Sequence, residues 1–250
     1  LRAGHPSGRT VYVTGRDPGL VAEAVGSWAV PVPDLLIADV GTTIASPQGA
    51  GWERWKAWDD RLAADWSDCP RENLQAMVEA VPGLSRQNAS RQSEFKLSWF
   101  TPGGEAGARA ADEVCRGLAD SGVRANVIWS EDEMTGRGLL DVLPSAATKR
   151  LALEFVADRW GYGTAEVVFA GDSGNDLDVL ASAFPAVLVA NADPAVREEA
   201  LRLSAESGFV DRLYCARGNL PGMNGNYAAG ILEGVLHYHP EWSGFMSGEI

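Results

Sequence analysis

Cysteine and histidine are scarce in this sequence, which has three residues of each among its 250 positions. Cys69, Cys115 and Cys215 are odd in number and far apart, which predicts buried thiols in a reducing cytoplasm rather than a disulfide framework. The histidines show no spacing typical of a zinc site. The pattern therefore argues against a scaffold held by disulfides or zinc, and it predicts a cytoplasmic location.

Basic residues are also few, since 21 lysines and arginines stand against 34 acidic residues and give a net charge of −13. A negative surface repels polyanions, so we predict neither nucleic acid nor an anionic membrane as a partner. No apolar run approaches 18 residues, and no secretory signal is visible. The length and a hydrophobic content of 46% predict a globular protein of one domain or two small ones.

Strands and helices alternate at both ends of the chain. Residues 10–15 are predicted to form a strand, 17–29 a helix and 34–40 a second strand. This βαβ order implies parallel strands with a right-handed crossover. After Pro144 the alternation returns, with helices or strands expected at 146–161, 165–183, 185–191, 193–206, 209–216 and 226–239. We therefore predict an α/β fold with a Rossmann-like parallel sheet built from residues 1–48 and 145–250.

The segment between these ends, residues 49–144, breaks the alternation. Its elements are expected as a helix, a strand, a helix and two strands, at 52–66, 94–102, 105–122, 124–130 and 137–144. We predict an inserted α+β domain. The first helix would carry Trp52, Trp55, Trp58 and Trp66, which either pack in the core or stack on a sugar ring.

The strongest chemical signal is the stretch "VVFAGDSGND". Asp172 and Asp176 lie four residues apart on a glycine-rich loop after an apolar strand. In an open parallel sheet, ligands bind beyond the carboxyl ends of the strands. Carboxylate oxygens on such a loop suit Mg²⁺, which takes few protein ligands and keeps several waters. The alternative is an acidic turn that caps the following helix.

Two weaker signals fit a phosphate site. Thr14 ends the first strand and Gly15 follows, so a hydroxyl and adjacent amides could form an anion cradle, although a strand-ending threonine is often structural. Lys149 opens a predicted helix. It could offset charge in phosphoryl transfer or simply lie in solvent.

These motifs, in this order, resemble the haloacid dehalogenase-like phosphatase superfamily. The sucrose-phosphate phosphatase group is the more similar part of it. "PDLLIADVGTTI", "FKLSWF" and "LLDVLPSAATKRLAL" are similar to that group's segments, and "GDSGND" and "AAGI" match it as they stand. The resemblance implies a Mg²⁺-dependent phosphatase acting on a phosphorylated disaccharide or glycoside, with residues 49–144 as its cap domain. We also expect a monomer.

The resemblance also assigns roles to individual residues. Thr14, Gly15, Lys149 and Asn175 would bind the phosphoryl group. Asp172 would be a magnesium ligand and Asp176 its support. Lys96 and Asp141 would contact sugar hydroxyls or, alternatively, lie at the surface as ordinary polar residues.

The nucleophile of that superfamily is missing from its expected place. It lies in D-x-D-x-T on a strand before the phosphate-binding threonine, whereas Asp39 follows Thr14 and is followed by Gly41 instead of a second acid. Asp39 is therefore expected to be a polar strand end. The nucleophile is expected upstream of Leu1, where it would form an aspartyl-phosphate. The alternative is a non-catalytic phosphatase-like domain of a sucrose-phosphate synthase type of protein.

Overall fold

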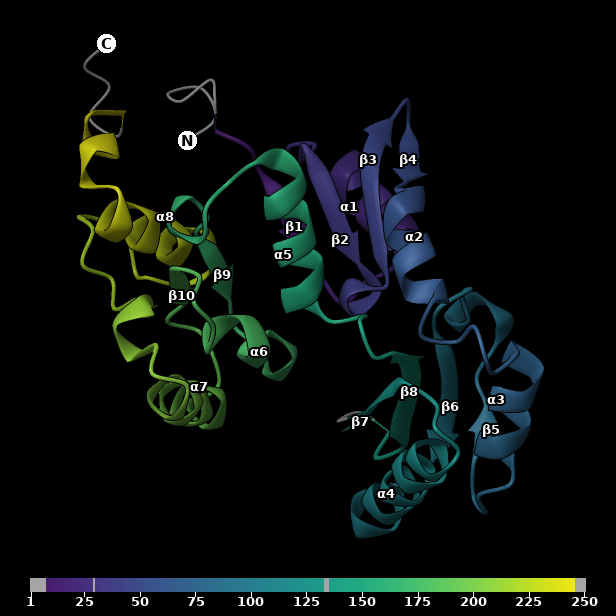
Figure 1. Ribbon diagram of the computed structural model, residues 1–250. Helices are drawn as coiled ribbons and strands as arrows, with labels where there is room; N and C mark the ends of the chain where they lie inside the picture. The colour runs from purple at the N-terminus through teal and green to yellow at the C-terminus, as the bar shows by residue number, and fades with distance from the viewer. Residues whose placement is uncertain (1–7, 29, 133–134, 246–250) are drawn as a thin grey trace. The chain divides into compact units, whose positions relative to one another are not determined.

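The structure is a computed structural model that describes residues 8–28, 30–132 and 135–245 (Figure 1). The described residues fall into two compact units. One unit is Tyr12–Ala152, and the other joins residues 8–11 to 153–245. The described strands form three hydrogen-bonded sheets, two of four strands and one of three.

The first sheet has the order β1-β2-β3-β4. Its strands are β1 (Val11–Val13), β2 (Leu35–Ala38), β3 (Thr43–Gln48) and β4 (Gly51–Arg54). Helix α1 (Pro18–Trp28) begins after Asp17, whose carboxylate accepts a hydrogen bond from the Leu20 amide and so caps the helix. Val21 of α1 packs on Leu36 and Ala38 of β2. This packing fixes β2, which is buried along its whole length.

The pair β3 and β4 is a hairpin that the sequence reading missed. Strand β3 runs antiparallel to both β2 and β4, and Gly49 at the tip has a φ of 59°. Trp52 lies in β4, and helix α2 (Lys56–Ala63) starts only afterwards. The predicted helix over 52–66 with four tryptophans is therefore wrong at both ends. Pro47 has no backbone N–H to donate to a neighbouring strand, so its presence argued against a strand at this position.

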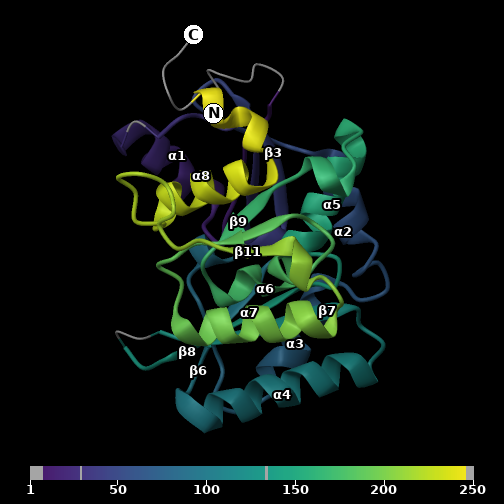
Figure 2. The same cartoon turned by 90° about the vertical axis from the view of Figure 1, so that its left-hand side faces the viewer.

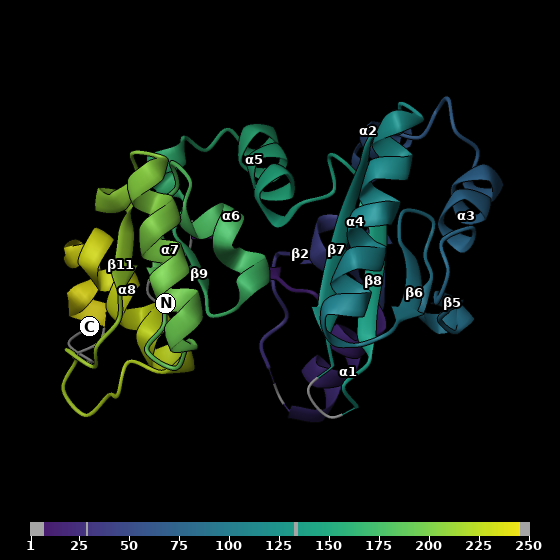
Figure 3. The same cartoon turned by 90° about the horizontal axis from the view of Figure 1, so that it is seen from below.

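The second sheet belongs to the same unit and has the antiparallel order β5-β6-β8-β7. Its strands are β5 (Ser85–Arg86), β6 (Leu97–Thr101), β7 (Ala125–Glu131) and β8 (Gly138–Pro144). Two helices accompany it, α3 (Arg71–Glu79) and α4 (Gly104–Asp120). Helix α4 packs on β7 and β8 and also contacts α3 (Figure 3). The apolar side chains Val114 and Leu118 of α4 are buried by this packing.

The other unit holds the parallel sheet β11-β10-β9 (Figure 2). Its strands are β9 (Phe169–Gly171), β10 (Ala186–Leu188) and β11 (Leu213–Cys215). Its helices are α6 (Leu177–Leu180), α7 (Pro194–Glu206) and α8 (Tyr227–Tyr238), while α5 (Lys149–Trp160) crosses the boundary between the units. Helix α8 packs on β10 and β11, and α6 packs on β9 and β10. Short 3-10 helices lie at Asp39–Gly41, Ala89–Arg91, Thr164–Glu166, Gly174–Asp176, Val210–Arg212 and Pro240–Phe245.

Glu233 of α8 fixes the loop that precedes its own helix. Its carboxylate is 3% exposed and accepts hydrogen bonds from the Tyr214 hydroxyl and from three successive amides, those of residues 217–219. Burial alone would raise the pKa of Glu233, but these donors outweigh it and lower the pKa. At the far end of the loop, the Ala190 amide donates to the Gly225 carbonyl at 2.9 Å. Both ends of the loop are therefore held.

Three predictions need comment. The predicted α/β fold with a parallel sheet is confirmed, although the described strands of residues 1–48 and 145–250 are hydrogen-bonded as two sheets, β1–β4 and β9–β11, and β3 is antiparallel. The division into a core of 1–48 with 145–250 and a cap of 49–144 stays a prediction. The prediction of buried thiols is wrong for Cys115, which is exposed on α4, while Cys69 and Cys215 are half-buried.

None of the helices in the described ranges is long and apolar enough to cross a membrane.

Candidate active site

The segment after β1 lies directly beside the turn after β2. The Thr14 amide donates to the Ile37 carbonyl at 2.9 Å, the Val40 amide donates to the Thr14 carbonyl at 3.2 Å, and the Asp39 amide donates to the Arg16 carbonyl at 3.0 Å. The Thr14 hydroxyl oxygen accepts a bond from the Arg16 amide, which leaves its proton to donate elsewhere. The predicted phosphate residue Thr14 therefore adjoins the turn that contains Asp39.

The turn itself has an unusual backbone. Asp39, Val40 and Gly41 have φ values of 49°, 59° and 100°, so three successive residues are in the left-handed region. That region is costly for a β-branched residue such as valine. Thr42 closes the turn, since its amide and its hydroxyl both donate to the Asp39 carbonyl, at 3.2 and 3.1 Å. Such a conformation persists only where surrounding contacts enforce it.

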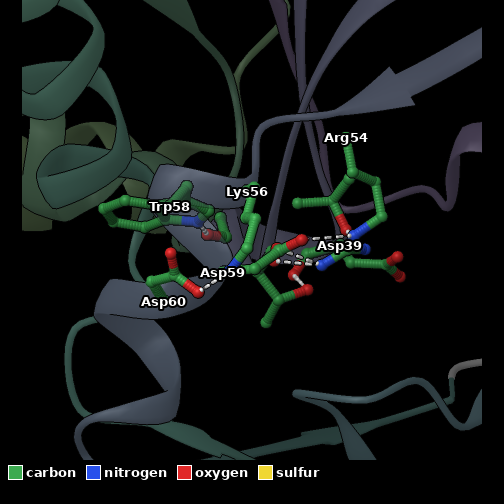
Figure 4. A network of polar contacts seen from close by, with 9 residues as sticks. Asp39, Arg54, Lys56, Trp58, Asp59 and Asp60 are labelled. Carbon is green, nitrogen blue, oxygen red and sulfur yellow. Dashed lines mark hydrogen bonds and ion pairs between the residues drawn. The ribbon is translucent and has the colours of Figure 1, made fainter.

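Those contacts come from β4 and α2 (Figure 4). The indole N–H of Trp58, which is fully buried, donates to the Gly41 carbonyl at 3.0 Å. Arg54 Nη1 donates to Thr43 Oγ1 at 2.8 Å. Arg54 also forms an ion pair with Asp59, with 2.6 Å between Nη2 and Oδ1. The hairpin and the helix after it thus brace the strained turn from one side.

The start of α5 braces the turn from another side. A Cβ atom on Gly41 would overlap the Thr148 carbonyl and approach the Lys149 amide to 2.9 Å, so the two segments are in close contact. Thr148 Oγ1 accepts a bond from the Leu151 amide and caps α5. Lys149 is only 4% exposed. A buried ammonium is retained where groups of opposite polarity compensate it, which suits a lysine of an anion site.

The carboxylate of Asp39 pairs with Lys96, which also pairs with Asp141 of the second sheet. Lys96, just before β6, has its Nζ 3.5 Å from Asp39 Oδ1 and 3.6 Å from Asp141 Oδ2 of β8. Ser98 donates to the other oxygen of Asp141 at 2.5 Å. Asp39 is 7% exposed, and burial raises its pKa against the opposing effect of the Lys96 ammonium, with Asp17 and Asp141 raising it further.

The loop after β9 is arranged differently. Asp172 is exposed, and its carboxylate accepts a bond from Asn191 Nδ2 at 3.3 Å. Asp176 is buried, and its Oδ2 accepts bonds from the Asp172 amide and from the amide and hydroxyl of Ser173, at 3.2, 3.1 and 2.8 Å. A Cβ on Gly171 would lie 2.7 Å from Asp176 Cγ, so only glycine allows the loop to fold back this closely. Asp176 therefore shapes the loop that presents Asp172.

The donor chemistry of this loop fits a magnesium ion in part. Asp172 offers an exposed carboxylate at a strand end, and hard oxygen ligands of this kind are what Mg²⁺ prefers. Asn175 is exposed on the same loop, and its Oδ1 accepts the Ser173 hydroxyl at 2.8 Å. In the described ranges, no three side chains of histidine, cysteine, aspartate or glutamate are grouped so that they could hold a metal ion.

The structure thus brings together several of the residues singled out in the sequence. In the unit Tyr12–Ala152, Thr14, Gly15 and Lys149 surround the turn, and Lys96 pairs with both Asp39 and Asp141. In the other unit, Asp172, Asn175 and Asp176 share one loop. The sequence did not predict that the side chain of Asp39 takes part in this cluster, or that Arg54 and Trp58 brace the turn. The ion pair between Asp39 and Lys96 joins residues 57 positions apart (96 − 39), and no local spacing signals it.

The fold is shared with a solved sugar phosphatase. The sucrose-phosphatase of Synechocystis sp. PCC6803, solved in complex with sucrose and phosphate, has a TM-score of 0.71 and 24% identity over 92% of this chain and 84% of that chain. This fold, a mixed α/β core with parallel strands and additional helices, is that of the haloacid dehalogenase-like hydrolases. The family model for sucrose-6F-phosphate phosphohydrolase matches residues 2–239, and the chain belongs to this family.

Two curated relatives align over 236 residues, or 94% of the chain. A putative HAD-like hydrolase of Nitrosococcus oceani is 39% identical, and a glucosylglycerol-phosphate synthase of Pseudomonas anguilliseptica is 27% identical. The chain spans 63% of the first relative and 27% of the second.

Proposed function

We propose that the protein containing this chain is a Mg²⁺-dependent phosphatase that hydrolyses a phosphorylated disaccharide or glycoside, most like sucrose 6-phosphate. The observation that carries the proposal is the gathering of Thr14, Gly15 and Lys149 around one strained turn, next to the polar cluster of Lys96 and Asp141. An anion site beside hydroxyl-binding groups is what a sugar phosphate requires. The match to the sucrose-6F-phosphate phosphohydrolase family supports it.

In this proposal the phosphoryl group is bound by the residues that the sequence singled out for it, Thr14, Gly15, Lys149 and Asn175. The Thr14 hydroxyl and the Gly15 amide donate to its oxygens, and Asn175 contributes a further donor. Lys149 offsets the negative charge that develops during transfer. The proposed reaction passes through an aspartyl-phosphate formed when an aspartate attacks phosphorus, and a second aspartate protonates the leaving sugar oxygen and then activates water.

Asp172 would bind the magnesium ion directly, and Asp176 would hold the loop that presents it. A magnesium ion held there would supply positive charge that offsets the charge of the phosphate. Residues 49–144 would form the cap that excludes water and reads the sugar. Lys96 and Asp141 would contact sugar hydroxyls, since an ammonium donates to them and a carboxylate accepts from them. We propose a cytoplasmic monomer.

A second function is favoured by one observation. The chain also aligns over 94% of its length with part of a glucosylglycerol-phosphate synthase. A phosphatase-like domain inside a synthase need not hydrolyse anything and could bind or dock instead. This candidate predicts sugar phosphate binding without phosphate release.

The test is phosphate release by the protein expressed with its natural flanking sequence, using sucrose 6-phosphate and glucosylglycerol phosphate with Mg²⁺ or with EDTA. Lys149→Ala is compared with Lys56→Ala, because Lys56 is an exposed lysine. We expect Mg²⁺-dependent release that falls at least 100-fold in Lys149→Ala and stays unchanged in Lys56→Ala. Tight binding of a sugar phosphate without turnover would favour the second candidate. Neither binding nor turnover would overturn both.

A further inference from the structure

The carboxylate of Asp39 has no part in holding its own turn. The turn is closed through the Asp39 carbonyl and amide, and it is braced through the Gly41 carbonyl, the Thr43 hydroxyl and the contact with Thr148. The Asp39 side chain instead forms an ion pair with Lys96. A buried carboxylate that the backbone geometry does not need is costly, and such a group is retained for another purpose.

The charges around this carboxylate are unbalanced. The groups that act on Asp39 are Lys96, Asp17 and Asp141, so with Asp39 itself three carboxylates share one ammonium. The side chains of Asp39, Lys96 and Asp141 are only 10%, 13% and 23% exposed. Interactions between partly buried charges are screened weakly by salt. The electrostatic potential at this partly buried cluster of Asp39, Lys96 and Asp141 is therefore negative.

The two ion pairs are also loose. Nζ–O distances of 3.5 and 3.6 Å exceed the 2.7–3.2 Å of a direct N–H···O hydrogen bond. A sugar hydroxyl can enter such a cluster, accept from the Lys96 ammonium and donate to a carboxylate without unpairing any charge. A carboxylate or phosphate on the sugar would compete for the same ammonium and meet like charges, which costs several kcal/mol at a desolvated interface.

We infer that Asp39 is a specificity-determining residue, which with Asp141 surrounds Lys96 and so admits glycosides that are neutral apart from the phosphate ester while rejecting those that carry a further anionic group. The inference rests on the proposed function and narrows its substrate class. Asp39 excludes substrates with a further anionic group, whereas Lys96 and Asp141 contact the sugar hydroxyls. Asp39 acts here through its charge.

A matched pair of substrates tests this directly. Glucosylglycerol phosphate and phosphorylated glucosylglycerate differ chiefly in a CH₂OH group of the first that is a carboxylate in the second. The protein with its natural flanking sequence is assayed with both. The variant is Asp39→Asn, because asparagine keeps the size of the side chain and also tolerates a positive φ. The control is Asp60→Asn, since Asp60 is an exposed acid paired with Lys56.

We expect the wild type to favour the neutral substrate at least 100-fold in kcat/KM. Asp39→Asn should reduce that ratio at least tenfold, mainly through a lower KM for the anionic substrate, and Asp60→Asn should leave the ratio unchanged. A ratio that Asp39→Asn does not alter, with phosphatase activity present, overturns the inference and leaves the proposed function standing.

If no phosphate is released, a binding measurement still distinguishes the role of Asp39 from the phosphatase proposal. Calorimetric titration with unphosphorylated glucosylglycerol and glucosylglycerate replaces the assay in that case. Binding of the neutral compound, with the anionic one bound only by Asp39→Asn, supports the role of Asp39 although the phosphatase proposal fails. Equal binding of both compounds by wild type and variant, or binding of neither, overturns the role of Asp39.

Discussion

Two loops of this molecule look alike in sequence and differ in construction. Asp39 and Asp172 each follow a short strand, with glycine close by. At the first loop the carboxylate is buried and paired with Lys96, and other residues hold the backbone. At the second the carboxylate of Asp172 is exposed, and a second acid, Asp176, holds the backbone. An acid at a strand end can thus tune the charge of a site or remain available as a ligand.

The largest effect should come from Asp172, the exposed acid. We expect Asp172→Asn to reduce Mg²⁺-dependent phosphate release by about a thousandfold, equivalent to about 4 kcal/mol, because a charged oxygen ligand is lost at the developing phosphate charge. Its free energy of unfolding should change by less than about 0.5 kcal/mol, as for an exposed residue. The measurement compares phosphate release with urea unfolding, and Asp158→Asn, an exposed acid on α5, is the control. A stability loss as large as the activity loss would remove the contrast between the two loops.

Gly41 should be the most sensitive position of the first loop. Its φ of 100° disfavours any L-residue, and an added Cβ would overlap the Thr148 carbonyl. We expect Gly41→Ala to lower the free energy of unfolding by about 3 kcal/mol, from backbone strain and steric overlap together. Gly49→Ala is the control, because Gly49 also has a positive φ but its Cβ would meet open space. Equal losses in the two variants, by urea denaturation, would mean that the contact with α5 is unimportant.

Asp176 should matter for stability, in contrast to Asp172. Replacing it with alanine removes the acceptor of three hydrogen bonds, those from the Asp172 amide and from the amide and hydroxyl of Ser173. We expect a loss of about 2 kcal/mol in the free energy of unfolding. Amide hydrogen exchange at residues 172 and 173 should accelerate as well. Unchanged protection of these amides would show that Asp176 does not hold the loop.

The smallest effect concerns pH. Because burial raises the pKa of Asp39 above its ordinary value, the folded state favours the protonated acid. The contribution of this group to stability is therefore full below the unfolded pKa of about 3.9 and is lost as the pH rises through the higher folded pKa. Asp39→Asn lacks this term, so its stability relative to the wild type should increase with pH across that window. Urea denaturation of both proteins at a series of pH values measures the difference, and parallel curves would contradict it.

Local pattern was sufficient for much of the fold. The pattern of apolar and polar residues located β6, β8 and α4 to within a few residues, because α4 has one buried face and the start of β8 alternates between buried and half-buried residues. It failed at β3 and β4, where Pro47 and the two glycines Gly49 and Gly51 look like a loop. The tryptophans at 52, 55 and 58 looked like one face of a helix, whereas Trp52 lies in a strand.

The candidate site divides in the same way. The loop around Asp172 was visible in the sequence, because its bonds connect residues within five positions of one another. The surroundings of Asp39 were not, because its partner Lys96 lies next to the second sheet, where it also pairs with Asp141, and the residues that brace the turn come from β4 and α2. Long-range ion pairs and a left-handed turn leave no periodic trace, so only the three-dimensional structure reveals the role of this acid.

The hydrogen bonds that Glu233 accepts from the loop before α8 affect where the length of this chain can vary. With one carboxylate fastening residues 217–219 and the Gly225 carbonyl bonded to the Ala190 amide, the segment between them is tied at both ends. The cost of closing a loop grows only slowly with its length once its ends are fixed. Residues 220–224 are therefore a natural place for insertions, where evolution can lengthen the chain or an engineer can graft an affinity tag without disturbing the parallel sheet.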